Sequence, residues 1–259
     1  MSKRDVRILS RPLALGFPNE WYEIACEGHF WLEWRLAAFL NLIDDLGIRR
    51  DQPWRGLDIG CGNGIVRMQI ERHCAWSVDG ADLNEEALRL NRAERGETFF
   101  YNIHDRNEEL AEAYNFIILF DVLEHIEEAG RFLDSVLFHL RPGGWLFINV
   151  PALEALRSAY DQAAGHVRRY DKAMMTRELA AHPLDLRDLR YWGLSLLPLL
   201  LLRTLVTARR RSTREIIQRG FEPPSPWINQ LLKMIMKIEA RLVHRPVLGT
   251  SLLATAVKR

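Results

Sequence analysis

The sequence predicts an α/β protein built on a doubly wound, mostly parallel sheet of seven strands, with a helical insertion near its C-terminal end. Two observations carry this prediction. Short apolar runs alternate with amphipathic segments through about a hundred residues, which is typical of consecutive β-α-β units. A glycine cluster, LDIGCGNG at residues 57–64, follows the first of these runs, where a strand turns into a helix in such folds.

The remaining elements follow from periodicity and stop signals. The segment 30–47 places apolar side chains at helical spacing and ends at Gly47, so it forms a lead-in helix. The other expected elements, in chain order, are strand 56–59, a helix from Ile65, strand 75–82, a helix from Asn84 to Gly96, strands 98–103 and 115–121, a helix from Ala129 to the Pro-Gly-Gly at 142–144, and strands 145–151, 184–192 and 249–257. We therefore expect four regions: a lead-in (1–50), a core (51–192), a helical insertion (193–248) and a final core strand (249–259).

Charge is distributed unevenly along the chain. The whole chain has a net charge of +1, but residues 191–259 hold twelve Lys or Arg against three Asp or Glu, which leaves a net charge of −8 in residues 1–190. The basic segment meets an anionic partner or packs on the acidic body. Three cysteines give no disulfide framework, and the first twenty residues lack an apolar signal core, so we expect a cytoplasmic protein.

The glycine turn and the acid that follows it point to a nucleoside. Gly60 and Gly62 begin a dinucleotide-binding pattern, but Ile65 stands where its third glycine belongs, which disfavours an NAD-dependent oxidoreductase. Asp82 lies 22 residues after Gly60, at the end of the second strand, where a carboxylate can accept hydrogen bonds from both ribose hydroxyls. Alternatively, Asp82 is an ordinary loop acid. Leu83 then offers an apolar edge to a base.

Four segments resemble the class I S-adenosylmethionine-dependent methyltransferases. They are LDIGCGNG, VDGADLNEEAL, FDVLEHI and LRPGGWLFINVP, and they cover about residues 56–151. The resemblance implies that the glycine turn forms a wall against the methionine part of the cofactor, while the strand ends hold its ribose and adenine. Many family members have aspartate where Asn102 stands. The cofactor residues that the resemblance implies are Asp58, Gly60, Cys61, Gly62, Asp82, Leu83, Asn102 and Phe120.

Arg35 is a further candidate for the cofactor. The lead-in segment HFWLEWR is similar to that of quinone-biosynthesis O-methyltransferases, in which an arginine about 25 residues before the glycine turn grips the cofactor carboxylate. Arg35 stands 25 residues before Gly60. A guanidinium suits a carboxylate because it can donate two parallel hydrogen bonds. The alternative is a surface arginine on an amphipathic helix.

A divalent metal ion is one option for the acceptor side. A similar E-x-x-E-H segment helps bind a divalent cation in small-RNA 3′-end methyltransferases and some quinone O-methyltransferases. The resemblance implies a candidate site of Asp121, Glu124, His125 and His166, whose first three members would share one side of a helix. The alternative, favoured here, is structural: His125 packs and Glu124 caps or pairs.

General-base catalysis is the other option. Histidine is the side chain that titrates nearest neutral pH, so His166 can take the proton of an acceptor hydroxyl, unless it is only structural. Asp161 belongs to the same cluster. Tyr170 would shape the pocket, and Arg168 and Arg169 would hold an acidic substrate group. The predicted catalytic residues are therefore His166, Tyr170 and His125.

The insertion predicts either a lid or a membrane contact. Its residues 228–242 place Lys233, Lys237 and Arg241 on one helix side, and the other side is apolar: Ile228, Leu231, Leu232, Ile235, Ile238 and Leu242. Such a helix lies on an anionic membrane surface, here the inner face of a membrane, or covers the substrate pocket. Leucines rather than stacking aromatics alternate with its basic residues, which disfavours a nucleic-acid partner.

These patterns predict a methyltransferase that uses S-adenosylmethionine, acting on the hydroxyl of a small, lipid-linked or glycan-linked acceptor. The segment VPALEALRSAYDQAAGHVRRYD and the ending GTSLL look like a bacterial branch of the superfamily that is linked with cell-envelope glycan or lipid-linked metabolism. The alternatives are a cofactor-binding domain without catalysis and an NAD-dependent oxidoreductase. The oligomeric state does not follow from the sequence.

Overall fold

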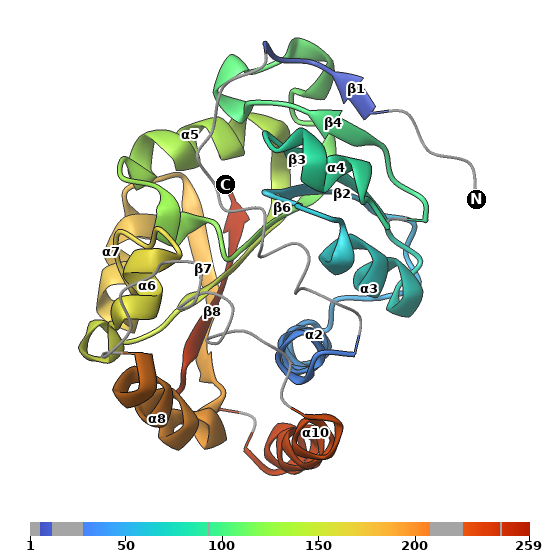
Figure 1. Ribbon diagram of the computed structural model, residues 1–259. Helices are drawn as coiled ribbons and strands as arrows, with labels where there is room; N and C mark the ends of the chain where they lie inside the picture. The colour runs from blue at the N-terminus through green and yellow to red at the C-terminus, as the bar shows by residue number, and fades with distance from the viewer. Residues whose placement is uncertain (1–5, 12–27, 93, 208–224, 244) are drawn as a thin grey trace.

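The computed structural model describes residues 6–11, 28–92, 94–207, 225–243 and 245–259, and its centre is an eight-stranded sheet (Figure 1). The strand order is β1-β4-β3-β2-β5-β6-β8-β7. Neighbouring strands run parallel, except that β8 is antiparallel to both β6 and β7. The strands are β1 Val6–Ile8, β2 Arg55–Ile59, β3 Ser77–Asp82, β4 Thr98–Phe100, β5 Tyr114–Phe120, β6 Leu140–Pro151, β7 Leu184–Trp192 and β8 Ser251–Lys258.

Helices cover both faces of this sheet, which confirms the predicted doubly wound architecture. Along β5, Phe116 and Ile118 pack against α2 and α3, while Ile117 and Leu119 pack on the opposite side against α5 and α7. This alternation explains why β5 is apolar throughout its middle. The helices are α2 Phe30–Asp45, α3 Ile65–His73, α4 Glu85–Arg89, α5 Ala129–His139, α6 Ala159–Ala163, α7 Lys172–Ala180, α8 Leu197–Thr207 and α10 Pro226–Leu242, and the 3₁₀ turns are η1 Ile103–Asp105, η2 Glu108–Leu110, η3 Leu123–His125, η4 Glu154–Leu156 and η5 Leu194–Leu196.

The eighth strand, β1, was not predicted. It pairs in parallel with β4 at the sheet edge, and it is tied there by ion pairs from Arg7 to Glu97 (3.2 Å) and Glu109 (3.4 Å). These side chains are about half exposed or more, so each pair contributes less than about 1 kcal/mol. Strand β1 is only three residues long and its Ile8 is exposed, so its sequence shows no apolar periodicity. The strand therefore depends on pairing with β4.

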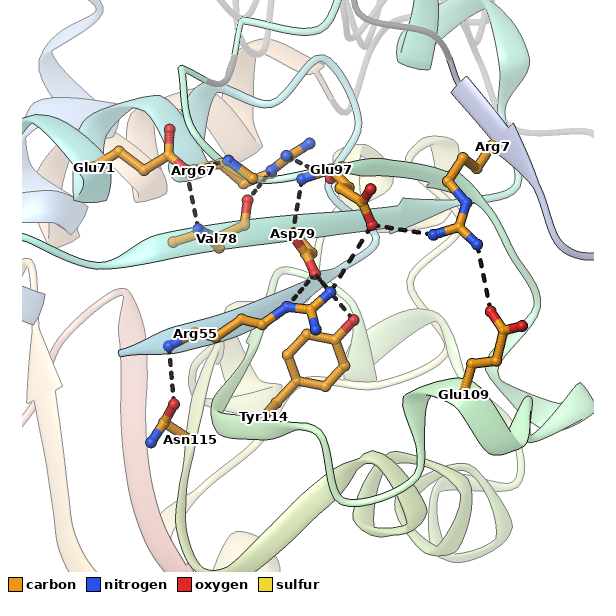
Figure 2. Close-up of polar contacts among 11 residues, drawn as sticks. Arg7, Arg55, Arg67, Glu71, Val78, Asp79, Glu97, Glu109, Tyr114 and Asn115 are labelled. Carbon is orange, nitrogen blue, oxygen red and sulfur yellow. Dashed lines mark hydrogen bonds and ion pairs between the residues drawn. The ribbon is translucent and has the colours of Figure 1, made fainter. Parts of the chain in front are cut away.

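Helix α4 is much shorter than predicted. Asn84 caps its start by accepting the N–H of Ala87 at 3.1 Å, as expected, but the helix stops at Arg89 instead of Gly96. The backbone N–H groups of residues 94–96 donate instead to the Glu71 carboxylate on α3. Figure 2 shows Glu71 beside Arg67, whose guanidinium donates to the Val78 oxygen on β3 and to the Glu97 oxygen at the end of this loop. Tertiary hydrogen bonds therefore override the local helical pattern.

A buried polar cluster fixes the first strands at the sheet end opposite the glycine turn (Figure 2). Asp79 is 2% exposed and accepts hydrogen bonds from Arg55 Nε (2.9 Å), the Tyr114 hydroxyl (3.2 Å) and the Glu97 N–H (2.8 Å). Because its partners come from β2, β5 and the start of β4, the cluster fixes their relative register. The carboxyl ends of these strands therefore lie level with one another.

The insertion packs against the lead-in helix. On α10, the Asn229 side chain accepts from the Phe30 N–H (3.1 Å) and donates to the Gly28 oxygen (3.0 Å), and Lys233 pairs with Glu33 at 2.6 Å. Figure 1 shows α2 and α10 side by side, although their residues lie about 200 positions apart. Among the described helices, none combines the length and the apolar character that crossing a membrane would require.

The apolar side and the basic side predicted for residues 228–242 both differ from the prediction. Leu232 packs into the cluster around α2, but Leu231, Ile238 and Leu242 are exposed, so the predicted apolar side is divided between the protein and solvent. Lys233, predicted on the polar side, lies largely buried in its ion pair. The division arises because α2 takes only one edge of the apolar side.

Candidate functional site

The glycine turn lies between β2 and α3, and its main chain requires the glycines. Gly60, Gly62 and Gly64 have φ angles of 73°, 52° and 75°, in the left-handed region that side chains disfavour. A Cβ on Gly60 would also lie 2.6 Å from a Val122 methyl carbon. Beside them, Cys61 is buried, and burial raises the pKa of its thiol well above the usual value, so the thiol is neutral. The turn is therefore a bare strip of main chain.

Asp82 at the end of β3 faces this turn. One carboxylate oxygen accepts from the Gly62 N–H at 2.7 Å, and the other accepts from the Asn84 N–H at 2.8 Å. Burial raises the pKa of Asp82, and these backbone hydrogen bonds oppose that shift. A carboxylate has about four acceptor positions, so acceptor capacity remains for a ligand such as a ribose. The predicted juxtaposition of turn and acid is present in the structure.

Asp58 lies beneath the turn with an unused acceptor. It is 2% exposed, and among the residues that the structure describes, nothing donates a hydrogen bond to its Oδ2. Burial raises its pKa to about 7, against the attraction of Arg67 and Arg35. A buried acceptor without a donor is costly unless a bound group satisfies it. The ammonium group of an amino-acid moiety fits this position chemically.

Arg35 reaches the same end of the sheet from α2. Its side chain is 3% exposed, forms an ion pair with Asp121, and lies over the rings of Trp31 (4.8 Å) and Phe120 (5.4 Å). Asp121 also accepts from the Asn149 side chain at 2.8 Å. The alternative of a surface arginine is therefore wrong. Whether Arg35 holds a cofactor carboxylate stays a prediction.

Two further cofactor candidates sit at the neighbouring strand ends. Leu83 packs with Leu88 and Phe100, and Asn102 caps η1 by accepting from the His104 N–H at 3.1 Å. The Asn102 N–H donates to the Ser10 hydroxyl at 2.8 Å. The stretch after β1 thus reaches the predicted adenine edge, which the sequence did not indicate.

Three of the four predicted metal ligands gather after β5. One ligand atom each from Glu124, His125 and His166 lies within 4.8 Å of the others, and the two imidazole rings are 4.8 Å apart. Asp121 is not part of this group because it pairs with Arg35. The predicted helical spacing was wrong, since residues 123–125 form a single 3₁₀ turn.

The chemistry of this group fits either a cation or a proton acceptor. Glu124 is 1% exposed, burial raises its pKa well above the usual value, and its Oε2 has no hydrogen-bond partner among the described residues. Burial and the nearby His166 lower the pKa of His125 to about 4, so this imidazole is neutral at physiological pH. A neutral imidazole and a buried carboxyl can hold a metal ion, which would ionise the carboxyl.

His166 is oriented by a residue that the sequence prediction did not assign to catalysis. Its Nδ1 lies 3.0 Å from the carboxylate of Asp161, which is fully buried on α6. Asp161 also accepts from Ser158 (2.8 Å from its N–H) and from Arg169 Nε (2.8 Å). Burial alone would raise the pKa of Asp161, but the hydrogen bonds from His166 and Arg169 hold it well below its usual range. The S-x-x-D capping pattern at 158–161 was the available signal.

The neighbouring predictions for Arg169 and Tyr170 change in the structure, and the one for Arg168 stays a prediction. Arg169 is 4% exposed and binds Asp161 and the Ala152 oxygen (2.9 Å), so it supports the site and does not face a substrate. Tyr170 is fully buried, with its hydroxyl 3.5 Å from the Leu123 oxygen, and burial raises its pKa to about 12. Tyr170 therefore supports η3 from the interior of the protein. Arg168 donates to the Glu127 oxygen at 2.6 Å.

Comparisons with known proteins identify the family of this chain. A family model described as a methyltransferase domain matches residues 16–192. The ubiquinone biosynthesis O-methyltransferase of Caulobacter vibrioides is 30% identical over 131 residues, which are 48% of this chain and 50% of that protein. The chain spans about half the length of the curated relatives it matches.

Solved structures share the fold at low sequence identity. A phosphoethanolamine N-methyltransferase from Haemonchus contortus, in complex with S-adenosylmethionine, has a TM-score of 0.51 at 16% identity and covers 85% of this chain and 52% of its own. The cyclase SpnF has a TM-score of 0.54 at 16% identity, with coverage of 84% and 81%. The same fold therefore serves both methyl transfer and cyclisation.

Proposed function

The chain belongs to the family of methyltransferase domains, and from this premise we propose that it methylates a hydroxyl oxygen of a small or lipid-linked acceptor. S-adenosylmethionine is the methyl donor of this family. When bound, it supplies an electrophilic methyl group on a positively charged sulfur. The protein then has to bind the cofactor, align the acceptor with the methyl group, and remove the hydroxyl proton.

For the cofactor, we propose three contacts, two from strand ends and one from helix α2. Asp82 holds the ribose hydroxyls, Asp58 receives the ammonium group, and Arg35 receives the carboxylate as it exchanges partners with Asp121. The unused Oδ2 of Asp58 supports the second contact, and the ion pair of Arg35 supports the third. Leu83 and Asn102 flank the adenine in this proposal.

For the acceptor, the observation that carries the proposal is the hydrogen bond from His166 to the buried Asp161. Because the Asp161 carboxylate can only accept, it selects the tautomer with the proton on Nδ1 and leaves Nε2 as the base. Nε2 takes the proton of the acceptor hydroxyl, and the hydroxyl oxygen would gain the methyl group as the bond from that methyl carbon to the cofactor sulfur breaks, leaving S-adenosylhomocysteine. His125 and Tyr170 position the base: His125 packs against it, and Tyr170 supports η3.

The test is methyl transfer from radiolabelled S-adenosylmethionine to a panel of phenols, catechols and prenylated catechols. An alkali-stable ether product is expected, and a methyl group transferred to a ring carbon would contradict the proposal. A thermal shift with S-adenosylhomocysteine but none with NAD would exclude the oxidoreductase alternative. Cofactor binding without turnover on any acceptor would favour a domain that lacks catalysis.

A metal-assisted reaction is the second candidate, and the unpartnered Oε2 of Glu124 favours it. In this version Glu124, His125 and His166, with Asp121 released from Arg35, hold a divalent cation that would lower the pKa of the acceptor hydroxyl. Calorimetric titration with Mg²⁺ and Zn²⁺ separates the two candidates. Absence of heat at millimolar metal, with activity retained in a chelator, leaves His166 as the base.

A further inference from the structure

Helix α10 carries a row of exposed apolar side chains along the side turned away from α2. Trp227 is 69% exposed, Met234 54%, Ile238 51% and Leu242 76%, and Leu231 at 43% completes the row. Spacings of three and four residues keep these side chains on one side of a helix with 3.6 residues per turn. A contiguous apolar stripe on a protein surface marks a contact with another phase or molecule.

The orientation of this row is fixed by the other side of α10. Met236 is 3% exposed and packs with α2, and Glu239 is 6% exposed. The Glu239 carboxylate accepts from the backbone N–H groups of Gly193 (3.1 Å), Leu194 (2.9 Å) and Ser195 (2.7 Å). Helix α10 therefore cannot rotate to bury the row without losing these contacts.

A second exposed apolar surface lies on α8. Leu199 is 40% exposed, Leu201 55% and Leu202 56%, whereas Leu200 between them is buried. Figure 1 shows α8 and α10 along the same lower edge of the molecule. We define the apolar edge as Trp227, Leu231, Met234, Ile238 and Leu242 of α10, and the three exposed leucines belong to a helix at the same end of the molecule.

The charge beside this edge is positive. Lys237 and Arg241 are exposed and stand one helical turn apart next to the row. Residues 193–248 contain ten Lys or Arg and three Asp or Glu, and the one acid among the described residues of this range is the buried Glu239. An exposed apolar row flanked by basic residues is the pattern of a helix that lies in the interface of an anionic bilayer.

We propose that the apolar edge docks the protein on an anionic lipid bilayer. Trp227 and the exposed leucines enter the boundary between headgroups and acyl chains, and Lys237 and Arg241 contact the lipid phosphates. A second copy of this chain is a poorer occupant, because a symmetric contact brings the same basic flanks together. Helix α8 also contacts α6, which carries Asp161, so docking places the acceptor cluster near the bilayer. That last consequence rests on the proposed function, whereas the docking itself does not.

The test is co-sedimentation of the full chain with vesicles of phosphatidylcholine, with or without phosphatidylglycerol. Binding is expected with phosphatidylglycerol at low salt and should fade as salt is raised. The double variant Trp227→Ser/Ile238→Ser should bind at least about tenfold more weakly. Lys237→Gln/Arg241→Gln should lose on the order of 20-fold. The matched control is Ile8→Ser, which removes a 59% exposed apolar side chain from β1 and should bind like the wild type.

Each variant is first checked for an unchanged thermal shift with S-adenosylhomocysteine, so that misfolding is not read as lost docking. Absence of vesicle binding at low salt would overturn the proposal, as would wild-type binding by both double variants. A dimer in analytical ultracentrifugation that Trp227→Ser disrupts, without vesicle binding, would assign the apolar edge to a second copy. None of these outcomes depends on methyl transfer, so the proposed function can fail separately.

Discussion

At the cofactor end of the site, the groups placed to meet a ligand are main-chain atoms and side chains at strand ends. Gly60 and Gly62 shape the turn, and the Asp82 carboxylate lies 2.7 Å from the backbone nitrogen of Gly62. At the acceptor end, His166 and Glu124 stand on short turns and are held by a buried network around Asp161. The first end is rigid because the sheet fixes it. The second depends on a few side-chain contacts, so changes there should alter turnover without altering cofactor binding.

The largest effect should come from His166→Ala. Removing a general base lowers kcat by roughly 10²- to 10⁴-fold, while the affinity for S-adenosylhomocysteine should stay unchanged. Single-turnover kinetics and calorimetry measure the two quantities. His73→Ala removes an exposed histidine outside the site and serves as the control. A loss of less than about threefold would show that the acceptor end has no dedicated base.

Asp82→Ala should act mainly on cofactor affinity, whereas His166→Ala should act on kcat. Losing hydrogen bonds to a charged carboxylate should weaken S-adenosylhomocysteine binding on the order of 100-fold. The matched control is Asp105→Ala, which removes an exposed acid near the end of the next strand. Equal weakening by both variants would mean that general electrostatics, and not the ribose contact, explains the loss.

Asp58→Asn tests whether the buried Asp58 carboxylate lowers the stability of the unliganded protein. The pKa of Asp58 is raised from 3.8 to about 7 in the folded protein, so the folded state binds more protons between these values and stability falls as pH rises through this window. The unliganded variant should therefore be more stable than the wild type by about 1–3 kcal/mol near pH 8, with a smaller difference toward pH 4. Urea unfolding at both pH values measures this. A less stable variant near pH 8 would contradict the assignment.

The smallest effect should come from Arg7→Ala at the edge of the sheet. Its ion pairs are exposed, so the free energy of unfolding should change by less than about 1 kcal/mol, and cofactor binding should not change. Chemical denaturation measures the difference. A loss above about 2 kcal/mol would mean that β1 helps to hold the predicted adenine edge together through Ser10.

The same contrast explains what could be predicted from the sequence. The seven core strands, the glycine turn and the position of Asp82 could be predicted from the sequence. Each is encoded by residues that are close together along the chain. Asp161 was placed in the cluster with His166 but given no role, and Arg169 was assigned to substrate, because the contacts that define them are made only when η3, α6 and the end of β6 meet. The predicted length of α4 was wrong for the same reason, because the backbone N–H groups that follow the helix donate to the Glu71 carboxylate.

The pairing of α2 with α10 has a consequence for how the chain matures. The lead-in helix leaves the ribosome early, but Asn229 and Lys233, which bind it, are synthesised about 200 residues later. Until then, the apolar surface of α2 lacks the part of its cover that α10 provides. A nascent polypeptide stopped before Pro226 would therefore leave this surface open to chaperones.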